Sequence, residues 1–261
     1  NIETDYLILA NGYDINLQNK YLWKLTKDNI EQVSKEQSVK LIEIESNIRD
    51  LIEPIVPWGY THGGCLVALG LLLRKEVKNV YIPSTYSTDQ LFNWGTHPDL
   101  DYLWSSEYTN FIHDGADKIR LEKIRLISNN NSVLSHLRVC YVNKKGKFNC
   151  GECDKCIRTM IALKIVGNLD KSKTFPHVIN LDTLSSLKIE GHSGSVFHNE
   201  NLIELKRLNI EPEIQQILEN KINNTVDKKD SILMVLAKKV WFWDHYYTRG
   251  LLYKFLNRNR Y

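Results

Sequence analysis

Residues 140–158 read CYVNKKGKFNCGECDKCIR and contain four of the five cysteines of the chain. These are Cys140, Cys150, Cys153 and Cys156, in the spacing C-x9-C-x2-C-x2-C. Thiolates at such short intervals can converge as a tetrahedron on one Zn²⁺ with no open position for a substrate, so the pattern predicts a structural zinc site. Free or disulfide-bonded cysteines are the alternative, but disulfides are uncommon in a chain of this size that has no secretory signal.

The residues around the cysteines also favour a metal. Gly151 has no Cβ, so the backbone there can turn its N–H groups toward the thiolate sulfurs. Four thiolates and one Zn²⁺ leave a double negative charge, which basic residues surround: Arg138, Lys144, Lys145, Lys147, Lys155 and Arg158. We expect this charge to be balanced locally and the fifth cysteine, Cys65, to be free within a helix.

Length and composition exclude several classes of protein. With 261 residues, 43% of them hydrophobic, the chain can bury one large core or two smaller ones, and a net charge of +3 does not by itself indicate nucleic-acid binding. No apolar run approaches the roughly 20 residues that span a bilayer, and no signal peptide opens the chain. We therefore expect no membrane partner and a cytoplasmic location. Because the chain begins at Asn1 and runs at once into a strand, we also expect part of the domain to lie upstream.

Apolar runs alternate with helical periodicity over the first third of the chain. We expect buried strands at 6–10, 39–44 and 80–83 and helices at 19–37 and 61–73. This alternation predicts an α/β domain in which a parallel sheet is covered on both faces, a three-layer doubly wound fold. Ligands of such sheets bind beyond the carboxyl ends of the strands, where polar clusters begin at Asn11, Ser46 and Ser84.

A segment without periodicity, 87–117, follows the third expected strand. Long structureless segments inside compact domains are usually functional loops. Its candidate site residues are His97, Asp99, Asp101, Glu107, His113 and Asp114. A solvated surface loop is the alternative, because His and Asp are common on surfaces. A helix at 119–127, which carries Arg120 and Lys123, then leads into the cysteines.

The chain changes character after Gly167, where we place the boundary between the α/β domain (1–167) and a helical extension (168–261). We expect helices at 181–189, 200–222 and 230–256, and a plain turn at 191–195. The last of these helices interleaves aromatic and basic residues. Such a helix can stack on single-stranded nucleic acid or rest on a membrane surface, but more commonly it docks on its own domain or on a partner subunit.

Cys140-Tyr141 followed by the block CGECDKCIR at 150–158 resembles the zinc motif of the 7-cyano-7-deazaguanine synthase family. That family belongs to the PP-loop ATPase (adenine nucleotide alpha hydrolase) superfamily. Other blocks are similar in their order: a strand ending near Gly12, a turn into a helix at His62-Gly63-Gly64, a loop with His97-Pro98-Asp99, and the basic helix. The likeness covers residues 5–167, and the zinc block is its most specific part.

The resemblance implies an ATP-dependent ligase. A carboxylate would attack the α-phosphate of ATP to give an acyl-adenylate and pyrophosphate, and ammonia would then displace AMP to form an amide. A second adenylation would dehydrate the amide to a nitrile. The implied cofactors are structural Zn²⁺, ATP and Mg²⁺, and the implied partners are a carboxylate substrate, an ammonia donor, and a second copy or an operon partner protein.

The resemblance also implies roles for individual residues. Those implied in catalysis are Arg120, Lys123, His97 and Asp99. Those implied in cofactor binding are Asn11, Gly12, His62 and Gly63. Those implied in substrate binding are Asp101, Glu107, His113, Asp114 and Arg158. For the basic side chains, a solvated helix face is the alternative.

The sequence differs from that of the family in two places. The Ser-Gly-Gly-x-Asp-Ser loop that holds pyrophosphate in the superfamily is absent, and the register of the likeness places it upstream of Asn1. We therefore expect residues 1–261 alone to be inactive. Residues 96–101 read THPDLD where the family has Tyr-Pro-Asp-Cys-Arg, which leaves the substrate open. Two alternatives therefore stay: a non-catalytic zinc-containing relative that binds a partner protein, as in bacterial anti-phage systems, and a tRNA-modifying PP-loop enzyme.

Overall fold

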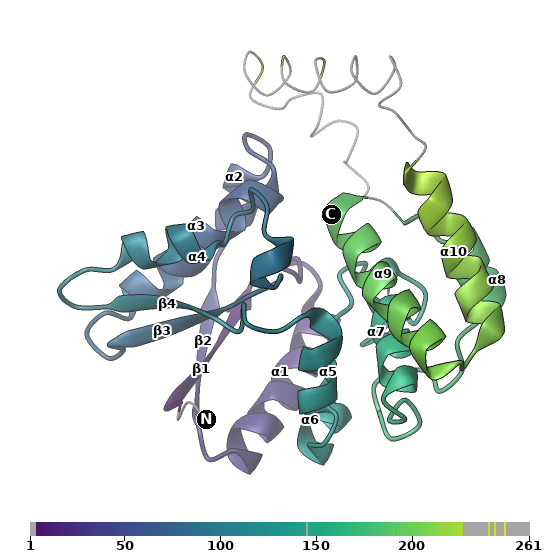
Figure 1. Cartoon of the computed structure of the whole chain (residues 1–261). Coiled ribbons are helices and arrows are strands. Elements are labelled where there is room, and N and C mark those ends of the chain that lie inside the picture. Colours follow the sequence, from purple (N-terminus) through teal and green to yellow (C-terminus); the bar gives the residue numbers. More distant parts are fainter. Residues whose placement is uncertain are drawn as a thin grey trace. The chain divides into compact units, whose positions relative to one another are not determined.

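The computed structural model describes residues 4–144, 146–189 and 191–226 together with Val240, Trp243 and Thr248 (Figure 1). The expected helix at 230–256 lies outside these residues, apart from the three single positions. The chain forms two compact units. Unit 1 comprises residues up to Leu9, Asn19–Glu43 and Ile119–Lys229, and unit 2 comprises Ala10–Gln18, Ile44–Lys118 and Asp230–Tyr261. Position 167, the expected domain boundary, falls inside unit 1.

The protein is mixed α/β, with its strands in two small parallel sheets. Strands β1 (Tyr6–Asn11) and β2 (Lys40–Glu45) form one sheet, and β3 (Asn79–Pro83) and β4 (Asn110–Asp114) form the other. In the second sheet Asn79 lies opposite Asn110 and Pro83 opposite Asp114. The three strands expected from the sequence are present, and within the described residues hydrogen bonds do not join the two sheets into one.

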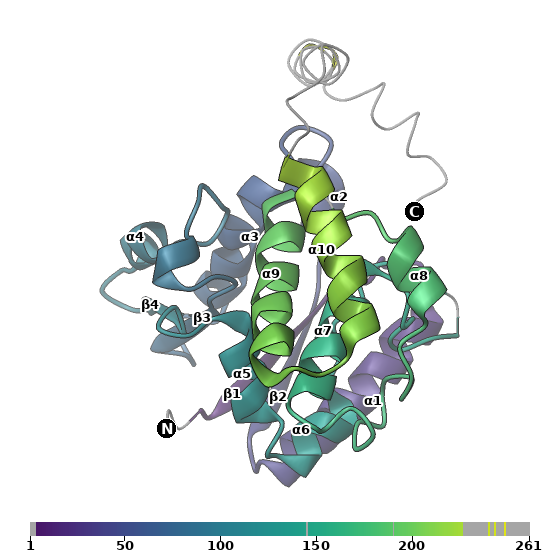
Figure 2. The same cartoon turned by 45° about the vertical axis from the view of Figure 1, so that its right-hand side comes forward.

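Helices of unit 1 surround one large apolar core. They are α1 (Lys20–Glu36), α5 (Arg120–Ile127), α6 (Asn131–His136), α7 (Asp154–Ile165), α8 (Leu181–Ser186), α9 (Gly191–Leu208) and α10 (Pro212–Val226). Nine of the twelve residues of α7 are buried, and Ile157, Ile161 and Leu163 are completely enclosed. Helix α9 packs against α7, and α10 packs against α9 (Figure 2). The core of unit 1 includes the four cysteines of residues 140–156.

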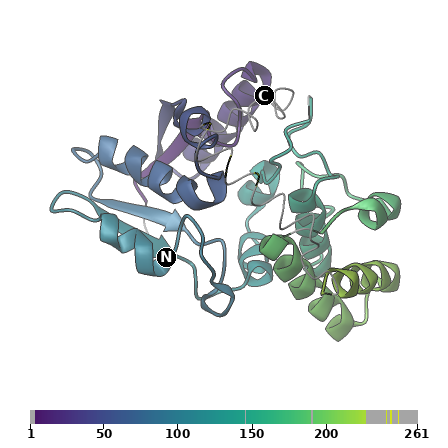
Figure 3. The same cartoon turned by 90° about the horizontal axis from the view of Figure 1, so that it is seen from above.

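Unit 2 has a smaller core on one side of the β3–β4 pair. Its helices are α2 (Ile48–Ile52), α3 (Trp58–Leu72) and α4 (Pro98–Asp101), with 3-10 turns η1 (Thr88–Gln90) and η2 (Tyr102–Trp104). Val67 of α3 packs with Ile82 and Phe111 of the two strands, which are drawn in blue in Figure 3. A Cβ on Gly70 would lie 2.7 Å from the Phe111 ring. Because Gly70 has no side chain, α3 can pack closely against the sheet at this position.

Three sequence-based expectations are wrong. The segment 87–117 is not structureless, because its residues 110–114 form β4, which has too few apolar residues to show a period and is held by pairing with β3. The expected turn at 191–195 is the start of α9, where Gly194 packs against Ile189. The expected helix 200–222 is interrupted at Asn209 and Glu211, which both have a positive φ, and α10 restarts at Pro212.

Candidate metal centre

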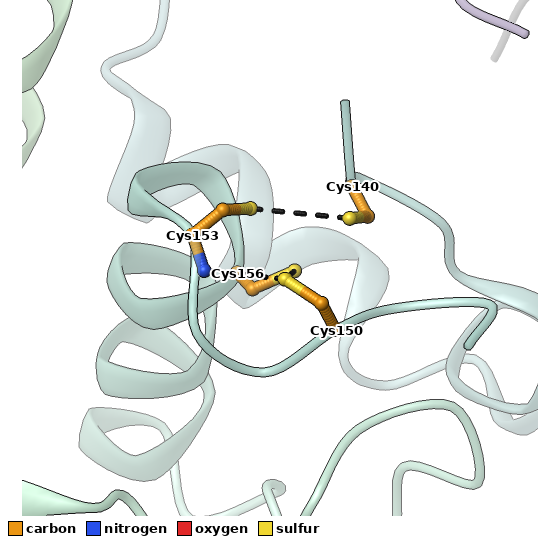
Figure 4. Close-up of side chains that lie close together, drawn as sticks. All are labelled: Cys140, Cys150, Cys153 and Cys156. Atoms are coloured by element: carbon orange, nitrogen blue, oxygen red, sulfur yellow. Dashed lines mark hydrogen bonds between the residues drawn. The ribbon is translucent and has the colours of Figure 1, made fainter. Parts of the chain in front are cut away.

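The four cysteines of residues 140–156 form one compact cluster, which we call the four-cysteine cluster (Figure 4). All four Sγ atoms lie within 4.8 Å of one another. The Sγ atoms of Cys140 and Cys153 are 4.0 Å apart, and those of Cys150 and Cys156 are 3.8 Å apart. A tetrahedron with Zn–S bonds of about 2.3 Å has edges of about 3.8 Å, so the sulfurs already lie close to the positions that a Zn²⁺ ion requires. All five cysteines lie in the described part of the chain and none forms a disulfide.

A tight turn after Cys150 directs backbone donors at the sulfur. Gly151 has a φ of +74°, a left-handed conformation that glycine adopts without strain. The N–H groups of Glu152 and Cys153 then donate to Cys150 Sγ, at 3.4 and 3.2 Å. The expectation that Gly151 turns N–H groups toward a thiolate is confirmed. Backbone N–H groups that donate to sulfur are the support that zinc-bound thiolates need.

Helix α7 begins at the cluster. Cys153 is the N-cap residue of this helix and Cys156 lies in its first turn, completely buried. The amino end of a helix carries a partial positive charge, which favours thiolates placed there. The same helix continues into the core of unit 1, so the cluster and the core are fixed by one element.

Asn149 connects the segment that carries Cys140 to the segment that carries Cys150. Its side-chain oxygen accepts from the N–H groups of Val139 and Cys140, at 3.0 and 3.2 Å. Its side-chain nitrogen donates to the carbonyls of Leu137 and Thr174, at 2.9 and 3.2 Å. The sequence analysis missed this buried residue, because its role depends on four backbone groups that only the fold brings together.

The pKa values of Cys140, Cys153 and Cys156 depend on one another. Hydrogen bonds from the neighbouring thiols lower the pKa of Cys140, and the hydrogen bond to Cys140 in turn raises the pKa of Cys153 to about 11. Hydrogen bonds to Cys140 and Cys153, together with burial, raise the pKa of Cys156. Without a cation the site therefore accommodates one thiolate readily and opposes further ones, whereas a bound dication would favour them all.

Three of the basic residues around the cluster, Lys144, Lys147 and Arg158, are paired with acidic ones. Lys144 and Lys147 both contact the Glu152 carboxylate, the latter at 3.2 Å. Arg158 Nη1 lies 2.9 Å from Asp154 Oδ2, and Asp154 Oδ1 also contacts His198 Nε2 at 2.9 Å. The positive charges near the cluster are therefore partly neutralised by Glu152 and Asp154, as well as facing the cysteines.

Arg120 and Arg158, for which the resemblance implies roles in catalysis and substrate binding, lie near the same aromatic ring. The guanidinium carbon of Arg158 lies 4.5 Å from the centre of the Phe197 ring, and that of Arg120 lies 6.0 Å from it. Burial, and secondarily the charge of Arg158, lower the pKa of Arg120. Lys123 follows on the same helix, α5, and is half-buried.

The structure brings together three of the candidate residues of 87–117. Asp101 is completely buried, and its Oδ2 lies 2.7 Å from His113 Nδ1. Its Oδ1 accepts from the His97 N–H at 3.2 Å. His97 caps helix α4 by accepting from the Asp99 N–H at 3.1 Å, while the Asp99 carboxylate itself is exposed. Glu107 and Asp114 are also exposed.

His62 and Gly63 lie near the start of α3, within unit 2. His62 Nδ1 contacts the Trp58 carbonyl at 3.0 Å, and burial lowers the pKa of His62. A Cβ on Gly63 would lie 1.7 Å from the Gly95 carbonyl oxygen, so α3 contacts the loop around Gly95 only because both residues are glycines.

The other two residues implied in cofactor binding lie at the carboxyl end of β1. The Asn11 side chain donates to the Glu45 carboxylate at 2.8 Å, and the Gly12 N–H donates to the Ile15 carbonyl. These groups thus already serve contacts within the protein.

Among the residues that the structure describes, no helix has both the length and the apolar character needed to cross a membrane. The four-cysteine cluster is the one group of three or more His, Cys, Asp or Glu side chains in that part of the chain that could hold a metal ion. Neither the family models nor the curated proteins nor the solved structures contain a match to this chain.

Proposed function

We propose that the four cysteines of residues 140–156 hold one structural Zn²⁺. The donor set supports this, because four sulfurs at tetrahedral separations leave no position for a substrate. Burial of Cys140, Cys150 and Cys156 in the core of unit 1 also favours a structural ion over a catalytic one. The ion would join the loop that carries Cys140 to the first turn of α7.

We further propose that this chain contributes to an ATP-dependent ligase of the 7-cyano-7-deazaguanine synthase type, located in the cytoplasm, with a three-layer doubly wound domain. The single observation that carries this proposal is the four-cysteine cluster, since its block is the most specific part of the resemblance. A substrate carboxylate would attack the α-phosphorus of Mg²⁺-bound ATP, and the bond to the departing pyrophosphate would break. Ammonia would then attack the acyl carbon and AMP would leave.

Charge at particular residues is consistent with the proposed chemistry. Arg120, Lys123 and Arg158 would stabilise negative charge on phosphate oxygens, as positioned cations do in phosphoryl transfer. Within unit 2, the buried Asp101 carboxylate lies 2.7 Å from His113 Nδ1 and orients that ring. The carboxylate substrate is proposed to be a deazaguanine-like acid.

The test uses protein expressed with whatever its gene encodes upstream of Asn1. It is incubated with ATP, ammonium and 7-carboxy-7-deazaguanine, and nucleotides are separated by chromatography. AMP and pyrophosphate formed in proportion to acid consumed would support the proposal. ADP with phosphate would refute adenylation, and AMP formation without loss of this acid would refute the substrate while keeping the reaction class. An Arg120→Ala variant should lose the activity but keep its zinc.

A further inference from the structure

The segment 98–109 buries two of its polar side chains and exposes several of its large apolar ones. Asp101 and Thr109 are almost completely buried. Asp101 is bonded to His97 and His113, and Thr109 Oγ1 donates to the Val77 carbonyl at 3.3 Å. Ser105 Oγ accepts from the Phe111 N–H at 2.9 Å, which attaches the segment to β4. Both ends of the segment are therefore anchored by hydrogen bonds.

Five large apolar side chains of this anchored segment are exposed. They are Leu100, Tyr102, Leu103, Trp104 and Tyr108, with exposed fractions from 37% for Leu100 to 63% for Leu103. Single exposed apolar residues are normal, whereas a concentration of them marks a binding surface. Aromatic residues held in place by their backbone are also the side chains that contribute most to interfaces. We call these five residues the 98–109 surface.

The electrostatic surroundings of the 98–109 surface indicate its partner. The segment 98–109 carries two exposed carboxylates, Asp99 and Glu107, and no lysine or arginine. A partner should therefore be basic as well as aromatic. The segment 227–261 of this chain has that composition, with eight lysines and arginines against three aspartates, and with Trp241, Phe242 and Trp243 in succession.

The segment 227–261 is long. A stretch of 35 residues can extend by at most about 3.3–3.6 Å per residue, and even a helical form rises about 1.5 Å per residue. Opposite charges steer such a segment toward an acidic surface and disfavour other ones. We propose that residues 227–261 bind the 98–109 surface of the same chain, with their aromatic side chains on Tyr102, Leu103 and Trp104 and their basic side chains toward Asp99 and Glu107.

The test is photo-crosslinking in the full chain. The photoreactive residue p-benzoylphenylalanine replaces Leu103 in one variant and Leu51 in a matched control, because both leucines lie in unit 2 with exposed fractions of 63% and 62%. After irradiation, peptides are identified by mass spectrometry in a mixture of isotopically labelled and unlabelled protein. We expect the Leu103 probe to react with residues 227–261 of its own chain, at least about fivefold more than the Leu51 probe.

Each other outcome contradicts the proposal. Products that join labelled to unlabelled chains would assign the surface to a second copy. Equal reaction from Leu51, or no product in 227–261, would remove the preference for the 98–109 surface. The paired substitutions Lys238→Glu and Lys239→Glu should reduce the Leu103 product at least about fivefold, since they replace attraction with like-charge repulsion, and an unchanged yield would exclude the electrostatic basis. Circular dichroism checks that each variant is folded.

Discussion

The four cysteines of the cluster belong to three different local structures. Cys140 follows α6 in a loop, Cys150 precedes the Gly151 turn, and Cys153 and Cys156 belong to the start of α7. The sulfurs are consequently fixed by a loop, a turn and a helix together. Removing one of them affects the connection between these elements as well as the charge.

Replacing Cys153 by Ser tests the metal. We expect zinc content to fall from about one ion per chain to near zero, and the free energy of unfolding to drop by several kcal/mol, since zinc-finger peptides gain roughly 10–16 kcal/mol from the ion. Elemental analysis and urea unfolding at a fixed zinc concentration measure both effects. Cys65→Ser is the control, because Cys65 is buried in α3 of unit 2, does not belong to the cluster, and should leave the zinc content unchanged. A folded, zinc-free Cys153→Ser protein of unchanged stability would disprove a structural role.

At the scale of residues, the sequence predicts the ligands better than their supports. Cysteine spacing is a local property, so Cys140, Cys150, Cys153 and Cys156 could be identified from the chain alone. The positive φ at Gly151 also follows from a local requirement. Asn149 could not be found in this way, because its four partners include Thr174, which is 25 residues away.

The turn at Gly151 offers a matched pair of substitutions. Gly146 and Gly151 both have a positive φ, but a Cβ would meet nothing within 4 Å at Gly146, whereas at Gly151 it would lie 2.7 Å from Pro176 Cγ. Gly146→Ala should therefore cost only the left-handed strain, about 1–2 kcal/mol. Gly151→Ala should cost about 1 kcal/mol or more beyond that, and should weaken zinc binding by disturbing the donors to Cys150. Urea unfolding and competition with a chelator compare the two, and equal losses would contradict the assigned contact.

Helix α3 should give the protein a pH-dependent stability through His62. Burial lowers the pKa of His62 below the value of about 6.5 that an unfolded histidine has. The unfolded state then binds a proton more readily, so this contribution to stability is complete above about pH 6.5 and is lost as the pH falls toward the lowered pKa. His62→Gln should have a flatter dependence of unfolding free energy on pH between about 7 and 5.5. An unchanged slope in the variant would assign the dependence to other groups.

Among the elements, those with a clear apolar period were predictable and those held by tertiary contacts were not. Helix 19–37 and the strands at 6–10, 39–44 and 80–83 lie within one or two residues of α1, β1, β2 and β3. Strand β4 has the sequence NFIHD, whose strand conformation depends on its neighbour β3. The glycines at the start of α9 predict a turn. In the structure Gly194 is helical, and its lack of a side chain lets Ile189 pack closely against it.

Among the described residues, unit 1 has a large apolar core and unit 2 a smaller one. The four-cysteine cluster belongs to the larger one, in unit 1, and none of its cysteines lies in unit 2. Metal binding should therefore stabilise the two units unequally, because its free energy is linked to the folding of the part that provides the ligands.

Removal of zinc by a chelator tests this asymmetry. We expect amide hydrogen exchange to accelerate across α7 and the neighbouring α9, whose residues share the core with the cysteines. Exchange in β3 and β4 of unit 2 should change much less. Mass spectrometry of proteolytic fragments, with and without chelator, measures both regions in one sample. A uniform acceleration over both units would show instead that the ion supports the entire chain.

Unit 1 is assembled from separated stretches of chain, with residues 44–118 inserted between α1 and α5. On the ribosome, α1 is made well before the helices with which it packs. At about 5–20 residues per second, synthesis of the insertion delays them by roughly 4–15 s. During that interval Asn29 of α1 lacks its hydrogen-bond partner in the folded protein, His136, which has not yet been synthesised. The nascent chain is therefore most open to capture by chaperones, or by another nascent chain, before residue 136 leaves the exit tunnel.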